Sequence, residues 1–192
     1  MISWFDIVAI QEVNDDLEGL RGTESFLPSE NNLIFTDKGG NNERSCFVYD
    51  GSIKNQLELV AEIAIPPKDH KWIKIDGFTQ TFTGFDRNPF LCSFQWRDEF
   101  ILLITVHSFF GSTSKSDIER RALEAFVIGR FADLRRNSVN AFSKNIIAMG
   151  DFNIPKVEPG DEVYKVLIKR GLHLPEHSTK VYSNITNDKM YD

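Results

Sequence analysis

Cysteine is scarce in this sequence, with only Cys46 and Cys92 among 192 residues. Each lies inside an apolar run, so we expect two buried free thiols and no disulfide framework. No stretch is apolar for long enough to span a membrane, and the start, MISWFDIVAI, has neither a basic leader nor a long apolar segment. We therefore expect a soluble chain without a signal peptide, cytoplasmic if this start is genuine.

The sequence also lacks a surplus of positive charge. It has 22 Lys and Arg against 28 Asp and Glu, for a formal net charge of −6, whereas nucleic-acid binders usually carry a basic face. This balance argues against a polyanionic substrate unless divalent cations neutralise acidic residues at the site. Repeats, linkers and low-complexity tracts are missing too. The length suits one domain, with a core in which 16 Phe supply much of the packing.

Apolar runs rich in β-branched and aromatic residues recur along the chain and predict strands. The predicted strands cover residues 5–10, 45–50, 57–65, 89–96, 100–106 and 145–149. Some runs are apolar on both faces, as in a central strand of a covered sheet, whereas 57–65 and 89–96 partly alternate like strands with one wetter face. We expect a mixed sheet.

The pattern changes to helical spacing between residues 114 and 137, with Ser116 as the expected N-cap. Five arginines in this segment alternate with acidic residues, which favours a solvated, salt-bridged face over a DNA-binding stripe. A second helix is predicted over residues 161–170, stopped by Gly171. Strands interleaved with helices indicate a layered α/β protein.

Polar residues that can do chemistry follow three of the most apolar runs. Gln11-Glu12 follows the first, His107-Ser108 the run ending at 106, and Gly150-Asp151-Phe152-Asn153 the last. Taken singly, each has a structural explanation: Glu12 as a turn carboxylate, His107 as a structural histidine, Asp151 with Asn153 as an Asx turn. Together they provide the hard oxygen ligands, the proton carrier and the hydrogen-bond donors that metal-assisted hydrolysis needs.

These residues also carry a resemblance to a known family. IVAIQEV, then ITVHSFFG, then IIAMGDFNIP is similar in order and spacing to the endonuclease/exonuclease/phosphatase superfamily, over nearly the whole chain. GDFN after an apolar strand is the most specific motif, QEV is moderately specific, and the single His is weak alone. The resemblance implies a four-layered α/β sandwich, two packed mixed β-sheets flanked by helices, with the site at one end of the sheets.

The resemblance also implies roles at that site. Glu12 would be the principal metal-binding carboxylate, for Mg²⁺ or Mn²⁺. Asp151 would orient or deprotonate the attacking water, and the Asn153 amide would contact phosphoryl oxygens or the metal. His107 would be an acid/base or phosphate-contacting residue, acting on a phosphodiester substrate, most naturally a nucleic acid.

Two more positions resemble the pancreatic deoxyribonuclease branch of the superfamily. Glu43, in NNERSCFVYD, resembles the carboxylate that orients the catalytic histidine, and Arg87, in FDRNPF, resembles an arginine that grips substrate phosphate. The structural alternatives are a solvated loop charge for Glu43 and a surface ion pair for Arg87.

The sequence departs from the family pattern at both ends. The metal-holding Asn of the family's first strand has no counterpart before residue 5, and the closing Ser-Asp-His motif is missing. Asp192 resembles the Asp that pairs with that terminal His, and His173 and His177 lie in a Gly/Pro loop that does not suit them as substitutes. We therefore expect a single domain over 1–192 that lacks the first and the C-terminal strand.

Three functions are compatible with these observations. The leading hypothesis is a metal-dependent, nuclease-like phosphodiester hydrolase. A lipid or small-molecule phosphoesterase of the same fold is the first rival, because fold kinship does not separate substrates; the FTQTFTGF stretch at 78–85 suits lipid docking, a DNA groove or a core strand. A catalytically inactive remnant that serves as a binding module is the second.

Overall fold

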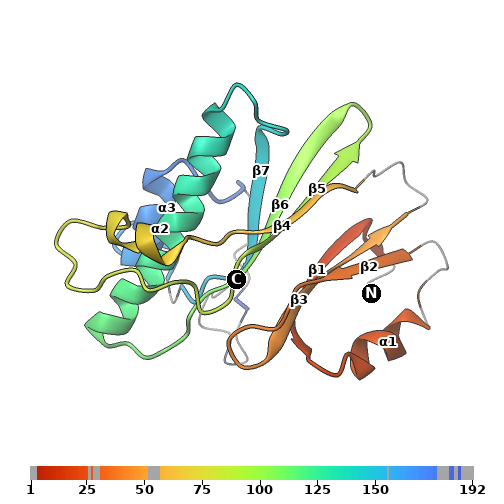
Figure 1. The fold of residues 1–192 in the computed structure, drawn as a ribbon, viewed down its shortest axis with the longest axis horizontal. Coiled ribbons are helices and arrows are strands. Elements are labelled where there is room, and N and C mark those ends of the chain that lie inside the picture. The colour runs from red at the N-terminus through yellow and green to blue at the C-terminus, as the bar shows by residue number, and fades with distance from the viewer. Residues whose placement is uncertain are drawn as a thin grey trace.

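The computed structural model describes residues 4–25, 27, 31–51, 57–154, 156–176, 182–183 and 186 (Figure 1). The strands are β1 (Ile7–Asn14), β2 (Asn31–Phe35), β3 (Glu43–Asp50), β4 (Leu57–Glu62), β5 (Phe90–Trp96), β6 (Glu99–His107) and β7 (Asn145–Asp151). The helices are α1 (Glu18–Glu24), α2 (Lys115–Asn137) and α3 (Glu162–Lys169), with a 3₁₀ segment η2 (Pro67–Trp72). Among the described residues, no helix is both long and apolar enough to cross a membrane.

The strands form two sheets. One has the order β1-β3-β2 with both pairings antiparallel, and the other has the order β4-β5-β6-β7 with a parallel pairing only between β6 and β7. Parallel neighbours need a crossover connection, and α2 supplies it between β6 and β7. Over the described strands only the four-stranded sheet is therefore mixed, whereas the family resemblance implies two mixed sheets.

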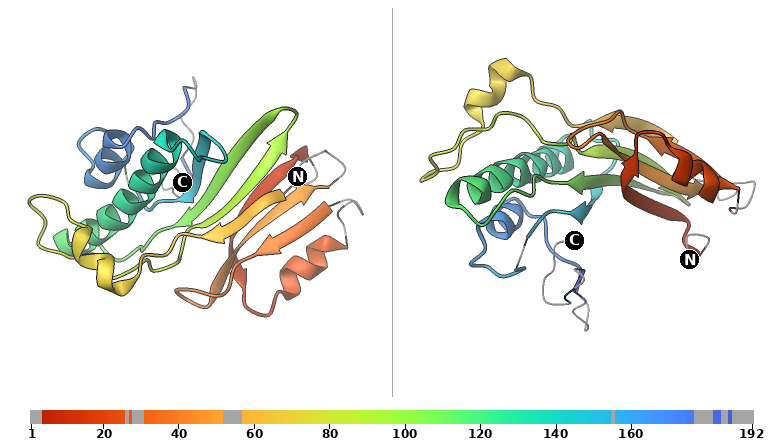
Figure 2. Two further views of the ribbon diagram at one scale, coloured as in Figure 1. Left: turned by 45° about the horizontal axis from the view of Figure 1, so that its top comes forward. Right: turned by 90° about the horizontal axis from the view of Figure 1, so that it is seen from below.

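The two sheets pack face to face between helices, as Figures 1 and 2 show. Aromatic side chains fill the space between the sheets: the Phe47 ring lies 5.5 Å from that of Phe90 and 5.9 Å from that of Phe94. The outer face of the four-stranded sheet is covered by α2 and α3, and that of the three-stranded sheet by α1. The predicted four-layered α/β sandwich is confirmed.

The strands differ in detail from the prediction. The strand expected over 57–65 ends at Glu62, and β1 continues past residue 10 to Asn14. The expected wetter face of β5 is wrong, because Phe90–Phe94 are buried on both faces, including Ser93. A central strand between the sandwich core and the helix layer has no face left for water. Both cysteines are buried and free, as expected, and burial raises the pKa of each thiol to about 12.

The N-cap of helix α2 lies two residues earlier than predicted. The Ser114 hydroxyl accepts a hydrogen bond from the Asp117 backbone N–H, so Ser114 and not Ser116 is the N-cap. The predicted solvated, salt-bridged face is present only in part. Arg135 and Arg136 are exposed, whereas Glu119, Arg121 and Glu124 are buried under the loops that flank β5 and β6. Helix α3 agrees with its prediction, capped by Asp161 and ended by Gly171 at φ +83°.

Candidate active site

The parallel pairing of β6 with β7 brings two predicted site residues together. His107 and Asp151 are the last residues of their strands and are direct partners in the register. The Ser108 backbone N–H then donates to the Asp151 carbonyl at 2.8 Å, which extends the pairing by one residue. Two polar groups predicted separately from their strand ends are thus held side by side by the sheet.

Strand β1 contributes the third predicted group from the opposite sheet. The register with β3 shifts between Ile10 and Val13, and Glu12 lies in this bulge at φ +57° with 67% of its side chain exposed. Bulges re-aim side chains next to active sites, and a positive φ is uncommon for a residue other than glycine. Glu12 thus projects from within β1 and not from a turn after it.

The neighbouring Gln11 side chain joins the two sheets. Its Nε2 donates to Thr105 Oγ1 at 3.1 Å and to the Val106 carbonyl, and its Oε1 accepts from the Asp151 backbone N–H at 3.2 Å. One amide therefore positions the bulge of β1 against the ends of β6 and β7.

The His107 imidazole lies between two carboxylates. Its Nε2 is 3.8 Å from Glu12 Oε1, and its Nδ1 is 3.9 Å from Glu43 Oε2, while 9% of the side chain is exposed. Both distances exceed a hydrogen bond, but they permit ion pairs when the ring is protonated. The ring is therefore flanked by a group exposed to the cleft on one side and a more buried one on the other.

Glu43 is shared between His107 and Arg87. Its Oε2 accepts from Arg87 Nε at 3.1 Å and from Nη2 at 2.8 Å, and Arg87 Nη1 binds Asp86 Oδ2 at 2.9 Å. The Arg87 side chain, 11% exposed, thus forms the ion pair weighed as an alternative to phosphate binding. A guanidinium has five N–H donors, so three are engaged here and two remain for a substrate oxygen.

Asp151 and Asn153 have a local structural role as well as a place in the cleft. Asp151 Oδ1 accepts from the Asn153 backbone N–H at 2.7 Å, which is the Asx-type contact considered above. The buried Asn153 side chain donates from Nδ2 to the Ser108 carbonyl at 2.8 Å, with the backbone at φ +53°. The loops that follow β6 and β7 are thereby tied together.

These residues line one cleft of about 530 Å³. Its lining comprises Glu12, Asn41, Glu43, Asp86, Arg87, His107, Phe109, Phe110, Gly111, Asp151 and Asn153. Six of the seven predicted site residues therefore meet, and the seventh, Asp192, lies outside the described residues. His177 also lies outside them, and His173 is exposed on the loop after α3, where it borders other hollows.

The arrangement of the sheets and helices is found in known structures. An endonuclease/exonuclease/phosphatase family protein from Bacteroides thetaiotaomicron matches 89% of this chain and 57% of its own at 18% identity and a TM-score of 0.56. ANGEL2, a 2′,3′-cyclic phosphatase, matches 88% of this chain and 45% of its own at 18% identity and 0.56. D. rerio TDP2 complexed with a single-stranded DNA product matches 84% of this chain and 51% of its own at 14% identity and a TM-score of 0.52.

The chain has the endonuclease/exonuclease/phosphatase fold. It spans 57%, 45% and 51% of the length of these three structures. No protein-family model and no curated protein matches the sequence.

The cleft of this endonuclease/exonuclease/phosphatase fold suits a hard divalent cation. Four carboxylates and one guanidinium line it, so a phosphate would be repelled unless a cation lowered the negative charge. No three His, Cys, Asp or Glu side chains of the described residues converge as a closed metal cage. Mg²⁺ needs no such cage, because it keeps several waters and binds through one or two carboxylates. The exposed Glu12 carboxylate fits that requirement.

Sequence reasoning did not assign roles to several residues of the site. Gln11 belongs to the QEV motif, but only the structure shows that its amide bridges the sheets. Asp86 has no predicted role and Glu124 is predicted only as one of the acidic residues between the helix arginines, although Asp86 binds Arg87 and Glu124 binds the backbone of Asp86. An acidic residue next to an arginine, such as Asp86, or within a charged helix, such as Glu124, is too common in sequences to indicate a role in a site.

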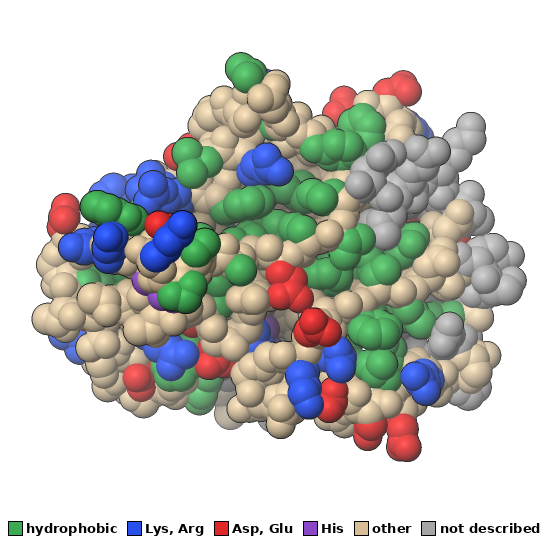
Figure 3. Space-filling model, in the orientation of Figure 1, with side chains coloured by type: hydrophobic (Ala, Val, Ile, Leu, Met, Phe, Trp, Pro, Cys, Tyr) green, Lys and Arg blue, Asp and Glu red, His purple; other side chains and the backbone are tan. Residues whose placement is uncertain are grey.

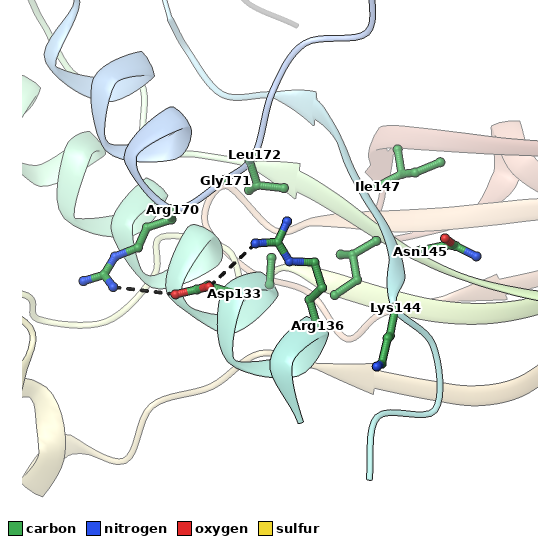
Figure 4. A pocket seen from close by; sticks show the side chains of 10 residues that line it. Asp133, Arg136, Lys144, Asn145, Ile147, Arg170, Gly171 and Leu172 are labelled. Carbon is green, nitrogen blue, oxygen red and sulfur yellow. Dashed lines mark ion pairs between the residues drawn. The ribbon is translucent and has the colours of Figure 1, made fainter. Parts of the chain in front are cut away.

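Other hollows carry different chemistry. At the start of β7, the strand end opposite Asp151, Asp133 pairs with Arg136 at 4.0 Å and Arg170 at 3.8 Å (Figure 4). Another hollow is apolar and includes the exposed Trp72 and Leu134; Figure 3 shows hydrophobic side chains in green across one face of the molecule. Neither hollow contains a predicted site residue.

Proposed function

We propose that the protein is a metal-dependent phosphoester hydrolase that cleaves a phosphodiester, with nucleic acid as its leading substrate. The observation that carries the proposal is the position of His107, between Glu12 and Glu43 and beside Asp151, in one cleft. An imidazole that is 9% exposed and lies among carboxylates at strand ends is suited to general acid–base catalysis.

Four side chains of the cleft take part in the chemical steps of this proposal. A Mg²⁺ or Mn²⁺ ion held by Glu12 would supply Lewis-acid stabilisation of a phosphoryl oxygen. The Asp151 carboxylate orients the attacking water and accepts its proton as the new P–O bond forms. His107 donates a proton to the leaving oxygen as the ester P–O bond breaks, and Glu43 stabilises the protonated ring.

Arg87 and Asn153 bind the substrate in this proposal. The two uncommitted N–H donors of Arg87 can contact a phosphoryl oxygen without breaking the ion pairs to Glu43 and Asp86. Because the Asn153 side-chain amide donates a hydrogen bond to the Ser108 carbonyl, it is held in place before the substrate arrives.

The fold relatives support a phosphoester and leave its type to experiment. One of them is a 2′,3′-cyclic phosphatase, and another is complexed with a single-stranded DNA product. The acidic cleft favours a substrate that enters together with a divalent cation. A linear nucleic acid and a cyclic phosphate are therefore the two substrates to test first.

The test is hydrolysis of plasmid DNA, single-stranded DNA and an RNA ending in a 2′,3′-cyclic phosphate, with Mg²⁺ or Mn²⁺. We expect cleavage that chelator abolishes and that falls by about 10²–10⁴-fold in His107→Ala and Asp151→Ala, because a proton carrier is lost in each. His173→Ala is the matched control, since this histidine is exposed outside the cleft and its loss should leave the rate unchanged.

Two results would oppose the proposal. Full activity in Asp151→Ala would exclude this mechanism. No cleavage of any substrate by a folded, metal-loaded chain would favour the inactive binding module instead.

A further inference from the structure

Helix α2 buries three charged side chains beneath the loops of the cleft. Glu119, Arg121 and Glu124 are 2%, 4% and 1% exposed. A buried charge is costly unless hydrogen bonds compensate it. Each of these three side chains forms hydrogen bonds with the backbone of a loop. Glu119 accepts from the Thr79 and Gln80 N–H groups, Arg121 donates to the Phe110 carbonyl, and Glu124 accepts from two separate loops. The helix therefore organises loops as well as covering the sheet.

Glu124 differs from the other two because its two oxygens bind different loops. Oε1 accepts from the Asp86 backbone N–H at 3.1 Å, in the loop that leads into β5. Oε2 accepts from the Phe109 backbone N–H at 3.0 Å, in the loop that leaves β6. The first loop continues directly into Arg87, and the second follows His107, the last residue of β6. One carboxylate thus spans the two segments that carry proposed site residues.

The surrounding contacts connect this carboxylate with the cleft wall. Arg120, one turn before Glu124, binds Asp86 Oδ1 at 3.2 Å and lies 3.7 Å from the centre of the Phe109 ring. Asp86 in turn binds Arg87, which binds Glu43. A displacement of the Asp86 loop would therefore be transmitted to Arg87 and to the carboxylate beside His107.

We infer that Glu124 is a positioning residue of the proposed hydrolytic site: its carboxylate holds the Asp86 and Phe109 loops together and so fixes Arg87 relative to His107. The inference deepens the proposed function and rests on it for its catalytic consequence. The anchoring itself is a property of the fold that can be measured without a substrate.

The protonation of Glu124 bears on how firmly the loops are held. Burial raises the pKa of this carboxyl to about 7, against the lowering effects of the Phe109 and Asp86 N–H groups and of Arg120, while Asp86 raises it further. The ionised carboxylate accepts from both loops. Protonation turns one oxygen into a hydroxyl, which donates and is a weaker acceptor, so the hydrogen bond to one loop weakens as the pH falls through this range.

The first test follows the backbone amides of Asp86 and Phe109 by ¹H–¹⁵N NMR between about pH 5.5 and 8.5, spanning the pKa range of a buried carboxyl. In the wild type both signals should move with one shared midpoint near the pKa of Glu124, about 7. In Glu124→Gln this shared transition should vanish from both signals, and both signals should shift upfield. Glu119→Gln is the matched control, because its carboxylate is equally buried but binds Thr79 and Gln80, which do not line the cleft.

The second test is kcat/KM for the substrate found above. Glu124→Gln should lower it between about 10- and 100-fold, mainly in kcat, because misplacing a group by about 1 Å has effects of this size, whereas Glu119→Gln should keep it within about two-fold. Unmoved Asp86 and Phe109 signals in Glu124→Gln overturn the inference, as does unchanged kcat/KM. If Glu124→Gln does not fold, the wild-type titration decides alone. Shifted signals in a chain that hydrolyses nothing would leave the anchoring intact and refute only the proposed function.

Discussion

At the scale of single residues, Gly150 occupies a position with no room for a side chain. Its backbone is at φ +117°, and a Cβ there would clash with Gln11 Nε2 and the Val106 carbonyl oxygen. These are the atoms that join β1 to β6 and lie next to Asp151. The Gly of the GDFN sequence is therefore explained by the close approach of the Gln11 amide.

We predict that Gly150→Ala destabilises the protein by about 2–4 kcal/mol, the sum of backbone strain and overpacking, and also lowers activity because Asp151 is displaced. Urea unfolding measures the first effect and the hydrolysis assay the second. Gly160→Ala is the control, since a Cβ there meets nothing within 4 Å. Equal stability of the two variants would contradict the account given for Gly150.

Among the predicted site residues, Arg87 shows what sequence reasoning can and cannot provide. A motif match places an arginine before a strand, but only the structure shows that this arginine is bound by Glu43 and Asp86. Glu12 is similar: the QEV match indicates a carboxylate near the end of a strand, whereas the bulge that turns it towards His107 depends on pairing with β3.

At the scale of elements, the start of α2 offers a direct test between two neighbouring serines. Ser114 accepts from the Asp117 backbone N–H at 3.2 Å, whereas Ser116 contacts only the Ser114 hydroxyl in the described hydrogen bonds. We predict that Ser114→Ala costs about 1 kcal/mol of stability, as for a lost N-cap, and that Ser116→Ala costs less than about 0.5 kcal/mol. Thermal unfolding of both variants measures the difference. A larger loss of stability in Ser116→Ala than in Ser114→Ala would support Ser116 as the N-cap.

Local patterns predicted the long elements and missed the short ones. The six predicted strands and two predicted helices all exist, because their apolar periodicity is strong. Strand β2 has five residues, and α1 contains two glycines, which weaken helix propensity. Strand β2 is held by its pairing with β3, and α1 is held by packing against the three-stranded sheet, as the buried Leu20 shows. Residues 78–85 form no strand, although Phe82 is buried there.

At the scale of the whole molecule, the layer order and the convergence of strand ends could be predicted, whereas the buried charges could not. Alternating Arg and Glu on a helix normally indicate a solvated face. Here Glu119 and Glu124 lie under loops that are 38–40 residues away in sequence, so no local pattern encodes their burial. Such contacts also make the stability of the whole protein depend on pH.

The two buried glutamates of α2 should affect that dependence with opposite signs. Burial raises the pKa of Glu124 from 4.5 to about 7. For Glu119 burial has the same raising effect, but hydrogen bonds from Gln80 and Thr79 outweigh it and hold the pKa below its usual range. Between pH 4.5 and 7 the folded state therefore binds more protons at Glu124 than the unfolded state does.

Because of this, the contribution of the Glu124 carboxyl to the free energy of unfolding is fully present below pH 4.5 and is lost as the pH rises through about 7. Glutamine does not titrate, so the stability of wild type minus that of Glu124→Gln should fall by about 3 kcal/mol across this range. Urea unfolding of both proteins at a series of pH values measures that difference, in which all other titrating groups cancel. For Glu119→Gln the difference should run the other way, with the wild-type advantage lost as the pH falls. If the stability difference between wild type and Glu124→Gln stayed constant with pH, this carboxyl would not pass from neutral to ionised inside the folded protein. The two loops would then be held by one protonation state of Glu124 over the whole pH range.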